Sequence, residues 1–438
     1  MKKQIKILIF TITLALSFVL SGCSSSVNNT QKTPAKKTRT TNKTPVINST
    51  SEDDNELTQD SSLLPLTLEA IEAGTIFIFE KENRKLFIQR NNGVIQAAYS
   101  SIPVEPGDKI CFYGYDYDYK PGHNLKIQCT GDCYVYGNVM SLLEFTAFAG
   151  KKEIKKQYAF LDLFKNNNKI KNHETLDIVL PATTLAGYCY LRMFSGCTGL
   201  TDAPELPATS LADSCYYSMF SGCTSLTEAP ELPATSLASS CYFSMFSDCT
   251  GLTEAPELPA TSLAGNCYYS MFSGCTDLTK APELPATTLD SSCYNSMFSG
   301  CTSLTEAPEL PATTLAGECY HSMFLGCTGL TKAPELPATT LATRCYYSMF
   351  SACTSLTEAP DLPATTLADY CYYSMFKDCT NLKSITCLAT TRTATLGTGL
   401  WLVNVSATGT FVKAEGTSWG VGINGLPEGW TTQDYVAP

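Results

Sequence analysis

The sequence predicts an α/β solenoid preceded by a small antiparallel β-sandwich domain, and two patterns carry this prediction. Residues 180–387 contain one 26-residue unit written eight times without insertion or deletion, the first copy being LPATTLAGYCYLRMFSGCTGLTDAPE. A fixed period of roughly 20 to 50 residues is typical of solenoids, in which each repeat buries its apolar face only against its neighbours. Residues 63–150 instead carry alternating apolar runs, such as Thr75–Phe79 and Lys109–Phe112, broken by turn sequences such as Asn91-Asn92-Gly93. Such runs are typical of a β-sandwich.

The first residues predict export. Residues 1–22 have a basic start and an apolar run at 7–20 that is too short for a stable membrane span. The sequence Leu20-Ser21-Gly22-Cys23 resembles the lipobox of bacterial lipoproteins, which implies that Cys23 carries the lipid. An ordinary signal peptide followed by a chance cysteine is the alternative. After Cys23, residues up to 62 are almost devoid of large apolar side chains and therefore predict a flexible tether.

The first half of each repeat predicts a helix. Counted from the first leucine, positions 6, 10, 14 and 18 of the first copy are Leu185, Cys189, Met193 and Cys197, a four-residue step. On a helical wheel, positions 6, 7, 10, 11, 14 and 15 share one half and hardly vary among the eight copies. The variable positions 8, 9, 12 and 16 occupy the other half. We therefore expect one helix per repeat with its constant half buried.

The second half of each repeat predicts a short strand. It reads Leu-Thr-x-Ala-Pro-Glu-Leu-Pro, and two prolines per repeat remove backbone donors, so any strand must be very short. One short parallel strand and one helix per turn is the plan of leucine-rich repeats. Accordingly, the run from Tyr216 to Thr227, which recurs in all eight copies, resembles the repeats of BspA-type leucine-rich-repeat surface proteins. The ending from Gly422 to Trp430 resembles the closing module of such proteins. The resemblance implies a bacterial cell-surface protein, with adhesion as the expected role.

Both ends of the array need caps, because terminal repeats would otherwise expose apolar faces. Residues 151–179 read as a degenerate N-terminal capping repeat, and residues 388–438 read as a C-terminal capping module. The module holds Trp401, Trp419 and Trp430, which either seal the exposed end by packing or stack on an aromatic or sugar ligand. In the β-domain, the loop from Tyr113 to Tyr119 is either a recognition surface or a solvated hairpin tip.

Cysteine usage predicts thiols in the repeats. Sixteen of the 21 cysteines occupy positions 10 and 18 of the repeats, and we expect two ladders of buried thiols. Helical cysteines eight residues apart would be about 12 Å apart by rise alone, and we expect copies in adjacent repeats also to be too distant for a bridge. Cys111, Cys129 and Cys133 form an odd group in the β-domain, which allows one pair and one unpaired thiol. Only three histidines occur, so we expect no metal site.

Charge places a candidate binding surface on the repeats. Residues 180–387 hold 19 acidic and six basic side chains, a net charge of 6 − 19 = −13, and many of the acids share positions 23 and 26. Stacking should align them in rows, which argues against nucleic acid or anionic lipid and favours a basic partner. A solubilising edge is the alternative. The candidate binding residues are Asp202, Glu205, Glu228, Glu231, Glu254, Glu257, Glu306, Glu309, Glu358, Tyr217, Phe243, Tyr269, Tyr347, Tyr373, Tyr115 and Tyr117.

Catalysis finds no support in the sequence. There is no nucleophile elbow, no His-Glu-x-x-His and no phosphate loop, so we expect neither an enzyme nor a cofactor. The sequence predicts a lipid-anchored protein of the cell envelope, on the outer membrane or cell surface, that binds an extracellular protein or glycan. Adhesion through the repeats is the first hypothesis. A glycan-binding lipoprotein acting through the β-domain and a structural spacer without a ligand are the two alternatives.

Overall fold

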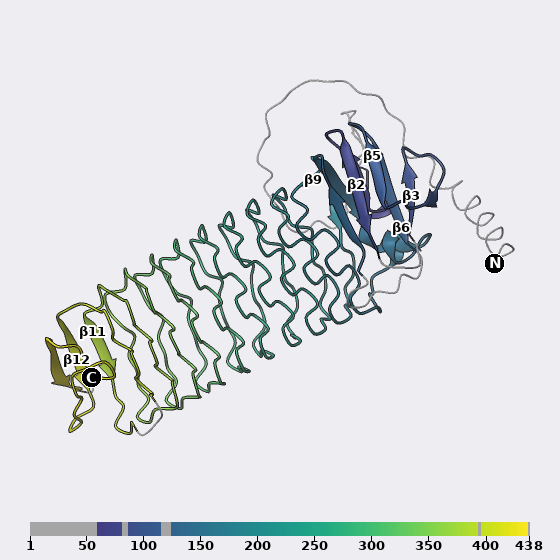
Figure 1. Cartoon of the computed structure of the whole chain (residues 1–438). Coiled ribbons are helices and arrows are strands. Elements are labelled where there is room, and N and C mark those ends of the chain that lie inside the picture. The colour runs from purple at the N-terminus through teal and green to yellow at the C-terminus, as the bar shows by residue number, and fades with distance from the viewer. Residues whose placement is uncertain (1–58, 81–85, 115–123, 393–395, 437–438) are drawn as a thin grey trace, which may run out of the picture. The chain divides into compact units, whose positions relative to one another are not determined.

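The computed structural model describes residues 59–80, 86–114, 124–392 and 396–436 (Figure 1). The predicted signal peptide, Cys23 and nearly all of the predicted tether lie outside these residues, as do Tyr115 and Tyr117. The regular elements within the described residues are strands and short 3-10 segments, with no α-helix among them. None of the described elements offers a helix with the length and apolar character that crossing a membrane requires.

The first part of the described chain is an antiparallel β-domain of two sheets, as the alternating apolar runs predict. The larger sheet has the order β10-β8-β1-β6-β3-β4, and the smaller has the order β5-β2-β7. Their strands alternate buried and exposed side chains; in β2, for example, Ile76 and Ile78 enter the core. The strands are β1 (Thr67–Ala70), β2 (Gly74–Phe79), β3 (Leu86–Arg90), β4 (Gln96–Ala97), β5 (Ser101–Val104), β6 (Lys109–Gly114), β7 (Lys126–Cys129) and β8 (Cys133–Asn138).

Short segments join the β-domain to the first coil of the repeats. β9 (Ile170–Asn172) and β10 (Ile178–Val179) both pair with β8 in parallel, so the larger sheet ends on strands from the predicted capping repeat. The 3-10 segments are η2 (Ser61–Leu63), η3 (Val139–Leu142) and η4 (Phe148–Gly150). The coil just before β9 has the geometry of a repeat, because Phe160 stacks on Tyr190 and Phe164 on Phe194 with ring centroids 5.3 and 5.7 Å apart.

The repeats form a stack of coils, and each coil buries side chains at the same positions (Figure 1). Positions 10, 11, 14, 15, 18 and 21 are Cys, Tyr, Met, Phe, Cys and Leu, and none of these side chains is more than 2% exposed in any copy. Equivalent rings stack face to face along the array, as Phe246 and Phe272 do at 5.7 Å. The core is therefore a set of ladders in which each residue packs on its own copies in the adjacent repeats.

The predicted helix is wrong, although its buried positions 10, 11, 14 and 15 are right. Positions 9, 13 and 17 have positive φ in every copy; in the second repeat they are Ser214 at 55°, Ser218 at 50° and Gly222 at 75°. An α-helix of L-residues requires negative φ at each of these positions. The segment is instead a run of turns, and the four-residue spacing of the apolar residues is the period of these turns.

The spacing between repeats explains why a helix cannot form. Packed helices keep their axes about 8 to 10 Å apart. The stacked Phe rings of neighbouring repeats, however, are 5.6 to 5.8 Å apart. Adjacent coils thus lie nearly as close as the strands of a sheet. At this spacing, the backbone of one coil hydrogen-bonds directly to the backbone of the next, which leaves no room for a helix in each repeat.

The predicted short strand is reduced to single β-bridges. At position 23, parallel bridges join Asp202 to Glu228, Glu228 to Glu254 and Glu254 to Lys280. At position 5, similar bridges join copies such as Thr314 and Thr340. The two prolines that follow position 23, such as Pro204 and Pro207 after Asp202, lack the amide that a longer ladder would need. Between β10 and β11 the described chain therefore contains bridges but no continuous strand.

The array continues one coil beyond the eight repeats. Leu396, Leu400 and Asn404 have φ of 45°, 56° and 59° and lie 26 residues after the equivalent positions of the eighth repeat. A parallel sheet then closes this end, formed by β11 (Ser384–Cys387), β12 (Gly409–Lys413) and β13 (Trp430–Asp434). The tryptophans pack as a seal: Trp401 is fully buried, and its ring lies 5.4 Å from that of Trp419.

Candidate binding surface

The acidic side chains of positions 23 and 26 form two exposed rows along one edge of the coils. The bridges at position 23 set Asp202, Glu228 and Glu254 side by side, and Lys280 follows them in the same row. Like charges on neighbouring strands repel one another. The repetition of acidic residues at positions 23 and 26 nevertheless gives this edge a net negative charge. The predicted acidic residues are all exposed: Asp202, Glu205, Glu228, Glu231, Glu254, Glu257, Glu306, Glu309 and Glu358.

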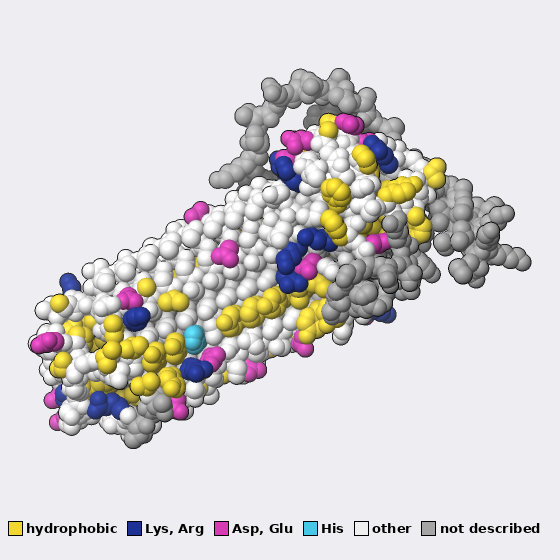
Figure 2. All heavy atoms as spheres, in the orientation of Figure 1, with side chains coloured by type: hydrophobic (Ala, Val, Ile, Leu, Met, Phe, Trp, Pro, Cys, Tyr) yellow, Lys and Arg dark blue, Asp and Glu magenta, His cyan; other side chains and the backbone are white. Residues whose placement is uncertain are grey.

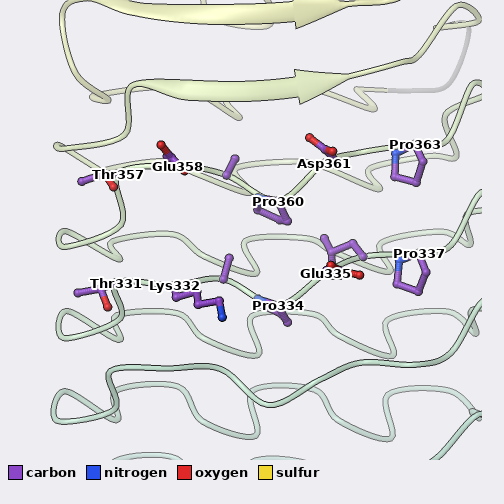
Figure 3. A pocket seen from close by; sticks show the side chains of 13 residues that line it. Thr331, Lys332, Pro334, Glu335, Pro337, Thr357, Glu358, Pro360, Asp361 and Pro363 are labelled. Atoms are coloured by element: carbon purple, nitrogen blue, oxygen red, sulfur yellow. The ribbon is translucent and has the colours of Figure 1, made fainter. Parts of the chain in front are cut away.

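A groove interrupts this edge between the coil segment where the sixth repeat ends and the one where the seventh repeat ends (Figure 3). Its volume is about 430 Å³, and it lies between residues 331–337 of one coil and residues 357–363 of the next. Parallel bridges join Glu306 to Lys332 and Glu358 to Ser384, but among the described residues none joins Lys332 to Glu358. The groove therefore lies at a break in the row of bridges.

The lining of the groove combines charge with apolar walls. Glu335, Glu358 and Asp361 supply three carboxylates, and Lys332 supplies one ammonium group. Figure 3 shows these side chains projecting from two adjacent coils, with Pro334 on the coil of Lys332 and Glu335 and Pro360 on the coil of Glu358 and Asp361. No ion pair within the described part of the chain involves any of these four charged groups. Their charges are therefore available to a partner. The prolines at 334, 337, 360 and 363 supply the apolar walls.

The aromatic candidates at position 12 form a second feature, a row of rings along the repeats. Figure 2 shows a line of hydrophobic side chains following the coils. Tyr217, Phe243 and Tyr269 stack with ring centroids 4.4 Å apart, and Tyr347 and Tyr373 stack at 4.8 Å. Because each ring covers the face of the next, the row exposes mainly ring edges. Sugar stacking needs an open ring face, so this row is poorly suited to it.

Other residues at position 12 interrupt or extend this row. Asn295 is buried and separates the first three rings from the ring of His321, which stacks on Tyr347 at 4.6 Å. Burial lowers the pKa of His321, which favours the neutral imidazole. The Nδ1 atom of His321 is buried without a hydrogen-bond partner among the described residues. The row at position 12 therefore contributes to the packing between repeats as well as to the surface.

Only Tyr113 and Gly114 of the predicted tyrosine loop are described. The ring of Tyr113 stacks on Phe145 at 5.0 Å, and its hydroxyl donates to Gln89 Oε1 at 3.1 Å. Burial raises the pKa of this hydroxyl above its ordinary value. Tyr113 therefore packs against the β-domain, whereas the binding candidates Tyr115 and Tyr117 lie outside the described residues.

The repeat cysteines are buried thiols, as predicted, but the argument for them needs correction. All sixteen are fully buried and unbridged. Copies in adjacent repeats are not far apart, however, because the amide beside one copy, that of Tyr216, donates to the carbonyl of the next copy, Cys241, at 3.0 Å. At position 18 the thiol of each copy donates to a carbonyl of the previous coil, as Cys223 Sγ does to Phe194 O at 3.1 Å. Each position 18 thiol is therefore hydrogen-bonded to a backbone carbonyl and not to another sulfur.

Sequence reasoning missed the groove. The prolines at positions 2 and 25 were read only as limits on strand length, yet they also form the walls that face the acidic side chains. The recurrence of prolines beside glutamate, in Ala-Pro-Glu-Leu-Pro, was the sequence feature that could have indicated such a groove. Within the described residues no cluster of three or more His, Cys, Asp or Glu side chains has an arrangement that could hold a metal ion.

Comparison with known proteins agrees with this geometry. No curated protein matches the chain. A family model, described as the BspA type leucine rich repeat region with six copies of the repeat, matches residues 162–305, 217–333 and 293–397. Together these stretches cover more than half of the chain, from within the capping coil to the first part of the ninth coil. The chain therefore belongs to the BspA-type leucine-rich-repeat family.

Proposed function

We propose that this protein is a lipid-anchored protein of the bacterial cell surface that binds a basic protein through the acidic edge of its repeats. Membership in the BspA-type family supports a surface-associated binding role. Solenoids of this kind present extended surfaces to their partners. The observation that carries the proposal is the groove at residues 331–337 and 357–363, where three carboxylates meet proline walls.

The groove suits a lysine or arginine side chain of the partner. Such a side chain has an apolar stem, which can lie along Pro334 and Pro360, and a cationic head, which can reach Glu335 or Asp361. Outside the groove, the acidic rows would attract the same partner over a longer range and speed its association. An acidic peptide or a nucleic acid would instead be repelled by the same rows.

Attachment to the membrane is the second part of the proposal. The lipobox-like sequence that ends at Cys23 supports a lipid anchor, and the polar segment after it supports a tether. A single acyl chain holds a protein to a membrane only weakly, so stable anchoring would need more than one chain. Metabolic labelling with a palmitate analogue tests this part: the wild-type chain should incorporate label, whereas Cys23→Ala should not.

Binding of simple charged polymers tests the charge specificity. The purified chain, without its first 23 residues, should bind poly-L-lysine and poly-L-arginine in a saturable manner and should not bind poly-L-glutamate. The affinity should fall steeply as salt rises from about 0.05 M to about 0.3 M, since exposed charges are screened. Equal binding of the cationic and anionic polymers, or binding that salt does not weaken, would contradict the proposal.

A further inference from the structure

Cys129 and Cys133 differ from every repeat cysteine in their surroundings. Cys129 ends β7 in the smaller sheet, Cys133 begins β8 in the larger sheet, and only Thr130, Gly131 and Asp132 lie between them. The side chains of the two cysteines are close enough for each to shift the pKa of the other, and the thiol of Cys133 also donates to the carbonyl of Gly131 at 3.6 Å. Cys129 is half-buried, so a reagent from solvent can approach it, whereas Cys133 is buried behind it.

The connection between the two cysteines is held in a fixed shape. The carbonyl of Asp132 accepts hydrogen bonds from the amides of Ile71 at 2.8 Å and Glu72 at 3.2 Å. A side chain at Gly131 would bring its Cβ within 2.7 Å of the carbonyl oxygen of Ala73. The turn is therefore pressed against residues 71–73, which holds the backbone between the two cysteines in place.

The pair also stands where the β-domain meets the first coil of the repeats. The amide of Cys133 donates to the carbonyl of Lys169 at 2.9 Å. Cys133 is also the first residue of β8 that pairs with β9. The side chain of Asn167 donates to Ile127 O at 3.2 Å and to Cys129 Sγ at 3.5 Å. In the coil of Asn167, this residue occupies the position that a buried cysteine holds in the repeats.

We propose that Cys129 and Cys133 form a disulfide by exchange with a disulfide-bearing oxidant after export, and that this bond clamps the junction between the β-domain and the repeats. Cys129 attacks the oxidant's disulfide as a thiolate, forming a mixed disulfide and releasing one oxidant sulfur as a thiolate. Cys133 then attacks Cys129 Sγ, the second oxidant sulfur leaves, and the Cys129–Cys133 bond closes. Each cysteine loses its proton, two electrons pass to the oxidant, and the oxidant ends as a dithiol.

The order of attack follows from exposure and hydrogen bonding. The thiol of Cys133, and to a lesser extent the amide of Asn167, lower the pKa of Cys129, since both stabilise its thiolate. The pKa of Cys133 is raised, first by its hydrogen bond to Cys129 and then by burial. Cys129 is therefore the nucleophile toward the oxidant, and Cys133 is the residue that resolves the mixed disulfide. The repeat thiols, fully buried, cannot compete for the oxidant.

Mass spectrometry of the full chain tests this proposal. Trypsin cleaves after Lys126 and Lys151, so both cysteines fall in one peptide, 127–151. The chain, purified under reducing conditions, is equilibrated with oxidised and reduced glutathione in graded ratios, then denatured and alkylated. We expect this peptide to lose two hydrogens and escape alkylation in oxidising mixtures, while the repeat cysteines are alkylated at every ratio.

Two variants serve as controls for the identity of the bonded pair. Cys111→Ser, the third cysteine of the β-domain, should leave the oxidation of peptide 127–151 unchanged. Cys133→Ser should abolish the internal bond and leave Cys129 alkylated or linked to glutathione. Full alkylation of both cysteines at every ratio would overturn the proposal, as would a bond from Cys129 to Cys111. Amide exchange at Cys133 in the oxidised chain should be slower than in the reduced chain, and equal rates would overturn the clamp.

Discussion

The amide of Tyr216 donates to the carbonyl of Cys241, 25 residues further along the chain, at 3.0 Å. The same bond joins Tyr242 to Cys267 and Tyr268 to Cys293, each at 3.0 Å. Amides at odd positions donate to the next coil in this way. Amides at even positions donate to the carbonyl three residues earlier, as Met219 does to Tyr216 at 3.2 Å. Together the two sets satisfy the backbone of the turn segment, which a buried chain requires.

Glycine should be tolerated at the left-handed serine of each turn segment, and a β-branched residue should not. Ser270 has φ of 51°, a conformation that costs an L-residue roughly 1 to 2 kcal/mol. We expect Ser270→Gly to leave stability unchanged or raise it by up to about 1 kcal/mol, and Ser270→Val to lower it by about 1 to 2 kcal/mol. Urea denaturation of both variants measures this. If the segment were helical, Ser270→Gly would be less stable than Ser270→Val, since glycine weakens helices more than valine does.

Removal of a buried hydroxyl from the tyrosine ladder should not destabilise the array. Tyr320 is 1% exposed, and its hydroxyl has no hydrogen-bond partner within the described structure. A buried polar group without a partner is unfavourable. We expect Tyr320→Phe to keep or raise the melting temperature, whereas Tyr320→Ala should cost about 3 to 5 kcal/mol by leaving a cavity between two rings. A large loss in Tyr320→Phe would show that the hydroxyl is satisfied.

Asp108 should stabilise the β-domain at neutral pH and lose this effect in acid. Its hydrogen bond from Arg90, followed by that from the Glu105 amide, lowers its pKa from 3.8 to about 2. A lowered pKa in the folded state stabilises the fold above the unfolded value of 3.8, and the gain disappears as the pH falls toward about 2. We expect Asp108→Asn to cost about 1 to 2 kcal/mol at pH 7.

The pH dependence distinguishes this effect from a packing defect. The difference in free energy of unfolding between wild type and Asp108→Asn should shrink as the pH is lowered below about 4. Urea denaturation at pH 7, 4 and 3, with the exposed Asp213→Asn as the control, measures it. If this difference stays constant over the pH range, the loss of stability in Asp108→Asn comes from altered packing or from the introduced asparagine amide and not from the charge of Asp108.

The repeat thiols should be unreactive until the protein unfolds. Burial raises the pKa of these cysteines, that of Cys223 for example to about 12, so almost no thiolate is present at neutral pH. A thiol reagent at pH 8 should leave the sixteen ladder cysteines unmodified in the native chain and should modify all of them in guanidinium without reductant. Few reactive thiols in the denatured, unreduced chain would show that the ladders are bridged.

The sequence predicts the buried residues better than it predicts the backbone. Cys189, Tyr190, Met193 and Phe194 are buried as the constant half of the predicted wheel requires. A four-residue spacing, however, is shared by a helix and by turns of four residues. The choice between them depends on the distance between adjacent repeats, which no single repeat encodes. Two local signs were available, because serine recurs at position 13 and glycine recurs at position 17, and both positions are left-handed.

The candidate surface was predicted in part, for a similar reason. Its charge could be predicted, because Glu231 and Glu257 repeat at one position and stacking must align them. The groove could not, because it depends on how residues 331–337 and 357–363 of two adjacent coils are placed in three dimensions. The ninth coil was also missed: Trp401 and Leu402 replace the Met-Phe pair there, and Leu388 is followed by alanine rather than proline.

The most direct test of the account is to compare two variants that each remove three negative charges. The first, Glu335→Gln with Glu358→Gln and Asp361→Asn, neutralises the groove. The second, Asp213→Asn with Asp277→Asn and Glu428→Gln, neutralises exposed acids elsewhere. The account predicts that the groove variant binds poly-L-lysine at least about tenfold more weakly than wild type, a loss of about 1.4 kcal/mol, and that the second stays within about twofold. Equal losses in both variants would contradict it.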